Sequence, residues 1–86
     1  MAEEIEIDGH KYSVEAEAFP LTLTKPFMHG DNALLVQKYL NQVYNAGLRE
    51  HGIFGHATSE AVKKHMELDE VTEGRFVFVQ NYNFKD

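Results

Sequence analysis

The chain of 86 residues contains no cysteine and no tryptophan. Without cysteine it forms no disulfide, no thiolate zinc site and no thiol nucleophile. Long apolar runs are also missing, since no stretch approaches the roughly 18 apolar residues of a membrane span. The N-terminal segment MAEEIEIDGH is acidic and has no apolar core, so we expect neither a signal peptide nor a membrane anchor in this chain. We therefore expect a protein that is either cytoplasmic or exported as part of a larger protein or particle.

Basic charge is scarce. The formal net charge is -6, and residues 1–20 carry six acidic residues against one basic residue. The middle of the chain, residues 21–66, is weakly basic and contains four of the five histidines, whereas residues 67–86 are again acidic. Nucleic-acid binding needs a basic footprint that displaces counterions from phosphates. The charge distribution therefore argues against a nucleic-acid partner.

Apolar residues make up 43% of the chain and aromatic residues 12%, which is typical of a folded chain. We expect a single domain in three parts. These are a hairpin and connector over residues 1–26, a helical module over 27–67 and a C-terminal strand over 68–86. A domain of this size buries roughly 60–65% of the surface that its unfolded chain exposes, so its core must be small.

The segment EIEIDGHKYSVEAEA predicts a β-hairpin. Apolar residues alternate with polar ones on either side of Asp8-Gly9, and Asp-Gly favours the two-residue turn that matches strand twist. The expected register places Ile5 opposite Tyr12, Glu6 opposite Lys11 and Ile7 opposite His10. The following segment LTLTK lies between Pro20 and Pro26 and predicts an extended connector or edge segment.

Residues 33–46 predict the first helix. Its apolar stripe contains Val36, Tyr39, Leu40 and Val43, flanked by Leu35 and Tyr44. Asp31 and Asn32 are candidate N-caps, and Gly47 is a candidate left-handed C-cap.

A second helix is expected from about Thr58 to Glu67, with Thr58 as its cap. Its expected inward face comprises Ala61, Val62, His65 and Met66, whereas Lys63 and Lys64 point outward.

The C-terminal run EGRFVFVQNYNF predicts a strand that is apolar on both faces at its start. We expect it to pair with the N-terminal hairpin, which is too small to be stable alone. The predicted fold class is therefore α+β, a small helical core of two main helices flanked by a hairpin that pairs with a C-terminal strand.

Residues 27–66 resemble the peptidoglycan-binding domain family. The family opens with Leu-x-x-Gly-Asp, where this chain has FMHGD at 27–31, and its second half reads Asp-Gly-x-Phe-Gly-x-x-Thr-x-x-Ala-Val-x-x-Phe-Gln. In HGIFGHATSEAVKKHM, residues 51–66, the matching positions are Gly52, Phe54, Gly55, Thr58, Ala61 and Val62. The departures are Ala33 for a glycine, Leu40 for a glutamine, His51 for the aspartate, and His65 and Met66 for Phe-Gln.

The resemblance implies a structural set, namely Gly30, Asp31, Gly47, Gly52, Gly55 and Thr58. We expect Gly52 and Gly55 to take positive φ angles or to lie close to other backbone. It also implies a shallow groove near the helix starts and the intervening loop. The candidate ligand-binding residues are Tyr39, Tyr44, His51, Phe54 and His56, and we expect His51 on the surface.

Catalytic and metal chemistry find little support in the sequence. Ser13 and Ser59 lack the context of a nucleophile elbow. The histidines His29, His51, His56 and His65 show no standard metal-ligand spacing such as His-x-x-x-His. We therefore expect no enzyme activity, no bound metal and no cofactor.

Two classes of function remain. The first is a non-catalytic module that binds peptidoglycan through its glycan or stem peptide, although an acidic protein is repelled by anionic wall polymers. The second is a protein–protein interaction protein, for example a small phage or bacterial component. The aromatic C-terminal run favours this second class, because Phe and Tyr are enriched at interfaces.

Overall fold

In the computed structural model, which describes residues 3–85, the N-terminal hairpin forms as predicted. Strand β1 spans Glu3–Ile7 and strand β2 spans His10–Ala16. They pair in the expected antiparallel register, Ile5 with Tyr12, Glu6 with Lys11 and Ile7 with His10. Asp8 and Gly9 have φ angles of 51 and 82, as the tight Asp-Gly turn requires.

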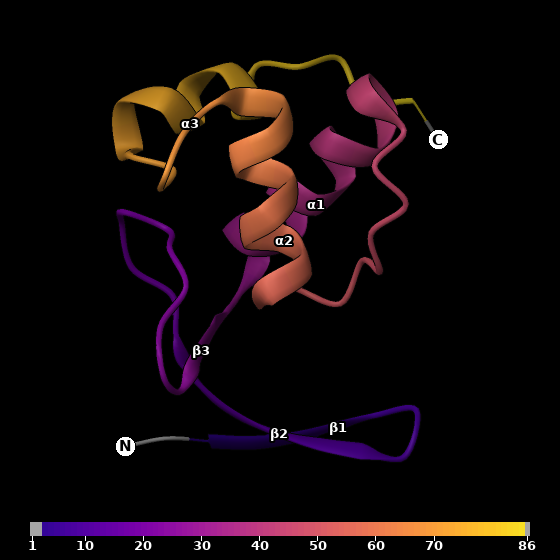
Figure 1. The fold of residues 1–86 in the computed structure, drawn as a ribbon, viewed down its shortest axis with the longest axis vertical. Coiled ribbons are helices and arrows are strands. Elements are labelled where there is room, and N and C mark those ends of the chain that lie inside the picture. Colours follow the sequence, from indigo (N-terminus) through magenta and orange to yellow (C-terminus); the bar gives the residue numbers. More distant parts are fainter. Residues whose placement is uncertain (1–2, 86) are drawn as a thin grey trace.

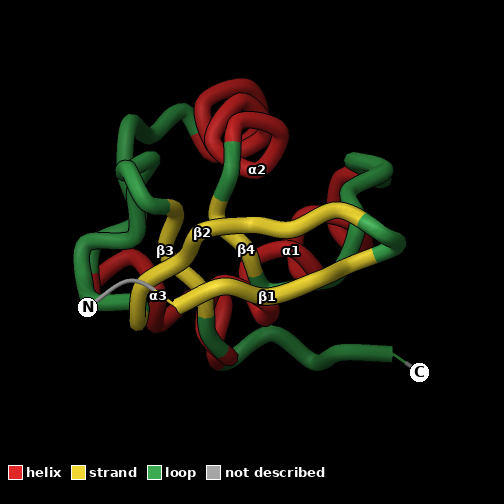
Figure 2. The backbone as a smooth tube through the Cα atoms, turned by 90° about the horizontal axis from the view of Figure 1, so that it is seen from below, coloured by secondary structure: helices red, strands yellow, loops and turns green. Residues whose placement is uncertain are grey.

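The sheet continues with short strands from the helical module, not with the C-terminal run. Strand β3, Phe27–His29, lies parallel to β2, and strand β4, Ile53–Phe54, lies antiparallel to β3, giving the order β1-β2-β3-β4. The hairpin crosses one end of the molecule and the helices gather at the other (Figure 1). Seen from below, the strands lie in front of the helices (Figure 2). The fold is α+β, as expected.

Helix α1 spans Asp31–Tyr44, but its start is capped from outside. The predicted N-caps are wrong, because Gly30 takes the cap position and no side chain there bonds the helix. The carboxylate of Glu17, which follows β2, accepts hydrogen bonds from the backbone N–H groups of Asn32 (2.9 Å) and Ala33 (2.8 Å). A distant carboxylate thus satisfies two of the free donors of the first turn and interacts favourably with the positive end of the helix dipole.

The buried stripe and the end of α1 also differ from prediction. The stripe consists of Ala33, Val36, Gln37 and Leu40, whereas Val43 is 40% exposed. The left-handed residue at the helix end is Asn45, with φ 54. Gly47 also has a positive φ of 72, but it lies two residues further along, in the loop.

The second helix begins earlier than predicted. Helix α2 spans His56–Ala61 and continues as one wider π-helical segment, η1, Val62–Met66. Gly55 takes the N-cap position, so the predicted capping role of Thr58 is wrong. Ala61 and Val62 are buried as expected, and Lys63 and Lys64 are exposed.

The predicted C-terminal strand is wrong. Residues Glu73–Gln80 form helix α3, whose N-cap Thr72 accepts a hydrogen bond from the Arg75 backbone N–H through its hydroxyl (3.2 Å). The helix buries Phe76 and Val79, spaced three residues apart, and leaves Val77 and Phe78 46% and 64% exposed. A short run of apolar residues fits both the two-residue period of a strand and the roughly 3.6-residue period of a helix. Packing against the core then decides between strand and helix.

The core joins all parts of the fold beyond the hairpin. It contains Leu21, Ala33, Val36, Leu40, Phe54, Ala61, Val62, Val71, Phe76 and Val79. Leu21 in the connector exchanges two backbone hydrogen bonds of 2.8 Å with Val71 before α3, which partly confirms the extended connector. Within residues 3–85, no helix is long and apolar enough to cross a membrane.

Candidate binding groove

The loop between α1 and β4 is held against α1 by Asn41. Its side-chain amide donates to the Leu48 carbonyl and accepts from the Leu48 backbone N–H, both at 2.8 Å. A side-chain amide that bonds both backbone groups of one residue acts like a neighbouring strand. The loop therefore has a defined path although it has no regular secondary structure.

Gln37 holds the end of this loop and the start of α2. Its side chain is fully buried. Its Nε2 donates to the Ile53 carbonyl (2.9 Å) and to the Thr58 hydroxyl oxygen (3.0 Å), and its Oε1 accepts from the Gly52 N–H (2.8 Å). Both amide protons are used, so the buried group is satisfied.

Sequence analysis missed Gln37. The signal was its position in the spacing i, i+3, i+4, i+7 that Ala33, Val36 and Leu40 share. A polar residue in such a stripe is buried and needs internal partners.

The two loop glycines play different parts. Gly52 has a φ of 79, and a Cβ atom there would lie 3.1 Å from the Gly30 carbonyl oxygen, so the prediction of a constrained glycine is confirmed at this position. The same prediction of a constrained glycine is wrong at Gly55. Its φ is -102, and a Cβ atom at this position would have no other atom within 4 Å.

His51 is half-buried beside the hairpin, not freely exposed. Its Nδ1 accepts a hydrogen bond from the Ile53 backbone N–H at 3.1 Å. Burial lowers the pKa of His51 below its usual value, and the nearby charges of Arg49 and His29 lower it further. These effects favour the neutral ring, and the bond that Nδ1 accepts leaves the proton of the neutral ring on Nε2.

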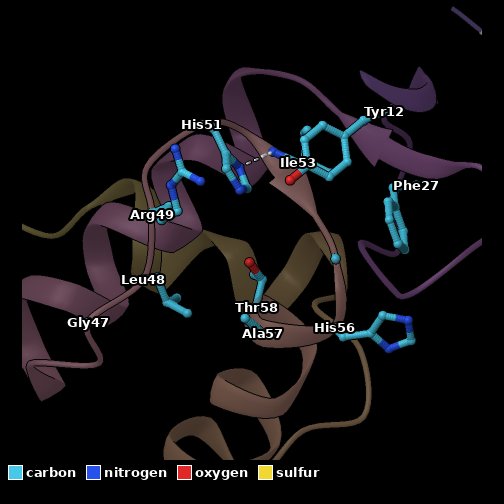
Figure 3. Close-up of a pocket in the computed structure, with 11 residues that line it drawn as sticks. Tyr12, Phe27, Gly47, Leu48, Arg49, His51, Ile53, His56, Ala57 and Thr58 are labelled. Atoms are coloured by element: carbon cyan, nitrogen blue, oxygen red, sulfur yellow. Dashed lines mark hydrogen bonds between the residues drawn. The ribbon is translucent and has the colours of Figure 1, made fainter. Parts of the chain in front are cut away.

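A groove lies between the hairpin and the start of α2. We call it the hairpin groove. Its volume is about 310 Å³ and it is lined by Tyr12, Phe27, Gly47, Leu48, Arg49, His51, Ile53, Gly55, His56, Ala57 and Thr58. In Figure 3, Tyr12 and Phe27 form the side opposite the loop that carries Leu48 and Arg49. An ion pair between Arg49 and Asp8 ties this loop to the hairpin turn.

The structure brings only part of the predicted site together. His51 and His56 line the hairpin groove, and the His56 ring meets the Phe27 ring edge-on at 5.7 Å between centroids. Phe54 is fully buried in the core, so it contacts no ligand. The sequence did not indicate Tyr12 and Phe27, because they reach the groove from β2 and β3.

Tyr39 and Tyr44 lie elsewhere, in an aromatic cluster at the C-terminal end of α1. The Tyr44 ring stacks on His65 at 4.8 Å, and the Tyr39 ring meets the rings of Tyr44 and Tyr82 edge-on at 6.2 and 5.4 Å. Burial, followed by the neighbouring Tyr44, raises the pKa of Tyr39 above its usual value. They line a different groove from His51 and His56, so the four residues do not form one site.

Within residues 3–85, no three histidine or acidic side chains lie close enough together to hold a metal ion. The lining of the hairpin groove contains tyrosine, histidine, threonine and arginine as its polar side chains, and no carboxylate. Its chemistry is that of a largely apolar surface with a few hydrogen-bonding groups, which is typical of a binding site.

Comparison of the chain with protein families, curated proteins and solved structures gives no match.

Proposed function

We propose that this chain is a non-catalytic binding module whose hairpin groove binds peptidoglycan, through its glycan or its stem peptide. One observation carries the proposal. The segment His51–Thr58, which has the strongest resemblance to the peptidoglycan-binding domain family, also supplies one side of the groove. The groove thus lies near the helix start and the intervening loop, where the resemblance implies a ligand.

The lining supports a ligand with both apolar and polar groups. Tyr12 and Phe27 offer aromatic surface for the apolar face of a sugar ring or for an acetyl methyl group. The Nε2–H of neutral His51 and the exposed His56 ring offer hydrogen bonds to hydroxyl or amide groups. A volume of about 310 Å³ suits one sugar ring or a short peptide segment.

The same lining favours binding over cleavage. Hydrolysis of a glycosidic bond uses a pair of carboxylates, and the groove lining has none. The Thr58 hydroxyl accepts a hydrogen bond from Gln37, and the His51 Nδ1 accepts one from Ile53. The bond to Ile53 occupies the lone pair that His51 would need as a base, and the Thr58 hydroxyl is held by Gln37 in a buried residue with no base bonded to it.

The test is titration of the protein with soluble peptidoglycan fragments, followed by NMR, together with co-sedimentation on purified sacculi stripped of anionic polymers. Binding is expected to shift the signals of groove residues. His56→Ala should weaken binding by about fivefold or more, which corresponds to about 1 kcal/mol. His10→Ala is the matched control, because His10 is exposed on β2 and does not line the groove. Absence of binding in both assays would remove this function.

A protein–protein interaction protein is the second candidate. The observation in its favour is the exposure of Val77 and Phe78 on α3. This helix lies away from the hairpin (Figure 1), so the two functions do not exclude each other.

A further inference from the structure

A second groove lies where three helical segments meet. We call it the three-helix groove. It lies between the C-terminal part of α1, the end of η1 and one face of α3, and its volume is about 270 Å³. Its apolar and aromatic lining comes from Tyr39, Tyr44, Met66, Leu68 and Phe78, and its remaining lining residues are His65, Glu67 and Arg75. It is independent of the hairpin groove, with which it shares no lining residue.

The exposed aromatic ring of Phe78 makes this groove a candidate contact surface. Helix α3 buries Phe76 and Val79 in the core, while Phe78 lines the groove and stays 64% exposed. Val77 beside it is 46% exposed. Adjacent exposed apolar side chains next to a groove are typical of a protein interaction site.

The acidic residues beside the groove favour a partner of positive charge. Glu67 lines it, and Asp69, Glu70 and Glu73 follow before and within the first turn of α3; all four are exposed. The ion pair found within residues 3–85 joins Arg49 and Asp8, so none of these four carboxylates forms an ion pair within the described chain. Together they outnumber the cation of Arg75, which also lines the groove. A second copy of the chain would bring the same acidic segment to the interface and be repelled.

The size and walls of the groove indicate how the partner binds. A volume of about 270 Å³ is below the range of about 300–1,000 Å³ that is usual for small-molecule pockets, and suits one or two apolar side chains. Most of the walls are helical, and the turn that carries Glu67 and Leu68 belongs to no strand, so the groove offers no strand edge. The partner must satisfy its own backbone, as a helix does.

We propose that the three-helix groove binds a basic amphipathic helix of another protein. An apolar side chain of that helix enters the groove beside Phe78. Lysine or arginine residues flanking its apolar face meet the carboxylates of Glu67, Asp69, Glu70 and Glu73.

The test uses the full chain and synthetic helical peptides of leucine and lysine, with leucines at the spacing i, i+3, i+4, i+7. One control peptide has the same composition in an order without an apolar face. The other keeps the leucine spacing and replaces lysine with glutamate. The leucine–lysine helix is expected to bind at least tenfold more tightly than either control and to shift NMR signals of groove residues. Its affinity should fall as salt is added.

Variants separate the apolar contact from the charge. Phe78→Ser should weaken binding of the leucine–lysine helix at least tenfold. The matched control is Leu23→Ser, because Leu23 is also an exposed apolar residue but lies in the connector and does not line the groove. A variant with Glu67, Asp69 and Glu70 changed to their amides should bind more weakly and lose most of the salt dependence. This variant tests the proposal even if Phe78→Ser does not fold.

Three results would overturn the proposal. The first is no binding, or equal binding of the reordered peptide. The second is a set of shifted signals that lies outside the three-helix groove. The third is self-association of the chain, measured by sedimentation, that Phe78→Ser abolishes, because the occupant would then be a second copy.

Discussion

At the scale of single residues, one buried side chain connects α1 to the binding loop and to α2. Gln37 bonds Gly52, Ile53 and Thr58, and these three groups lie on the segment that forms the hairpin groove. The shape of the groove therefore depends on a residue that does not line it.

Replacing Gln37 with leucine should destabilise the domain by about 3 kcal/mol. The change keeps the approximate size of the side chain but leaves three polar groups without their partner, and each unpaired buried group costs about 1–3 kcal/mol. Urea unfolding measures the difference. Gln42→Leu on the same helix is the control. Its partner, the Lys85 backbone, is exposed, so water replaces the lost bonds and the cost should stay under about 1 kcal/mol. Equal effects of the two changes would contradict the assigned role of Gln37.

The two loop glycines should respond differently to alanine. Gly52→Ala places a side chain at a φ of 79 and against the Gly30 carbonyl, and should destabilise by about 1–2 kcal/mol or more. Gly55→Ala should cost no more than about 1 kcal/mol, because its φ is ordinary and the space beside it is open, and only its N-cap position disfavours alanine. Thermal melts of both variants test this contrast, and a larger loss at Gly55 would contradict it.

His51 should make stability depend on pH. Its folded pKa lies below the usual 6.5 because of burial, Arg49 and His29. The unfolded chain therefore binds a proton more readily, so the contribution of neutral His51 is complete above about pH 6.5 and is lost as the pH falls through the folded value. Protonation of Nδ1 also removes the acceptor for the Ile53 N–H.

His51→Asn tests this directly. The asparagine side-chain carbonyl accepts a bond from the backbone two residues on but does not titrate. Urea unfolding at several values between about pH 7.5 and 5 should show a smaller loss of stability for the variant than for the parent. Identical profiles would mean that His51 does not contribute.

At the scale of elements, each helix starts in a different way. Helix α3 has a local cap, Thr72, which is a signal that the sequence carries. Helix α1 depends on Glu17, located fifteen positions before Asn32. Gly30 leaves room for this contact, since a Cβ atom there would lie 2.4 Å from the Glu17 Cδ.

Glu17→Ala should therefore destabilise α1 and the domain by about 1–2 kcal/mol, because two N–H groups of the first turn lose a charged acceptor. Asp31→Ala is the control. Asp31 lies in the same turn and makes no cap bond, so its removal should cost only a few tenths of a kcal/mol through the helix dipole. Urea unfolding measures both. If Asp31→Ala costs more than Glu17→Ala, Asp31 is the real cap.

At the scale of the whole molecule, β1 and β2 contribute unequally. No residue of β1 is buried, whereas β2 contains the buried Val14 and leads to Glu17. The connector after β2 then places Leu21 in the core. The hairpin is thus joined to the core through its second strand.

Two truncations test this arrangement. Removing the chain through Gly9 should leave a cooperative thermal transition at a lower temperature. Removing it through Ala18 should abolish the transition, because Val14 and the Glu17 cap are lost together and a small domain has only about 5–10 kcal/mol of stability. A domain that melts normally without residues 1–18 would show that the hairpin is dispensable.

Local patterns determined the hairpin and the first helix. The Asp8-Gly9 turn requires φ angles that few other pairs accept, and the alternating residues beside it leave one good register. Residues 33–44 are long enough for their period to be read from the sequence. In the binding loop, the sequence likewise placed Gly52, His51 and His56 near a helix start. The hairpin turn, the first helix and the placement of these loop residues all depend on residues that are close in sequence.

Tertiary structure decided the rest. The run from Arg75 to Val79 fits a strand or a helix, and the core selects a helix that buries Phe76 and Val79. Glu17 and Gln37 bond partners at least fifteen positions away, which no local pattern reveals.

The groove itself also depends on tertiary structure. Tyr12 and Phe27 become walls of the hairpin groove only when β2 and β3 pair. Tyr39 and Tyr44 lie outside the hairpin groove because they project from α1 toward η1 and α3. Such contacts arise from packing in three dimensions.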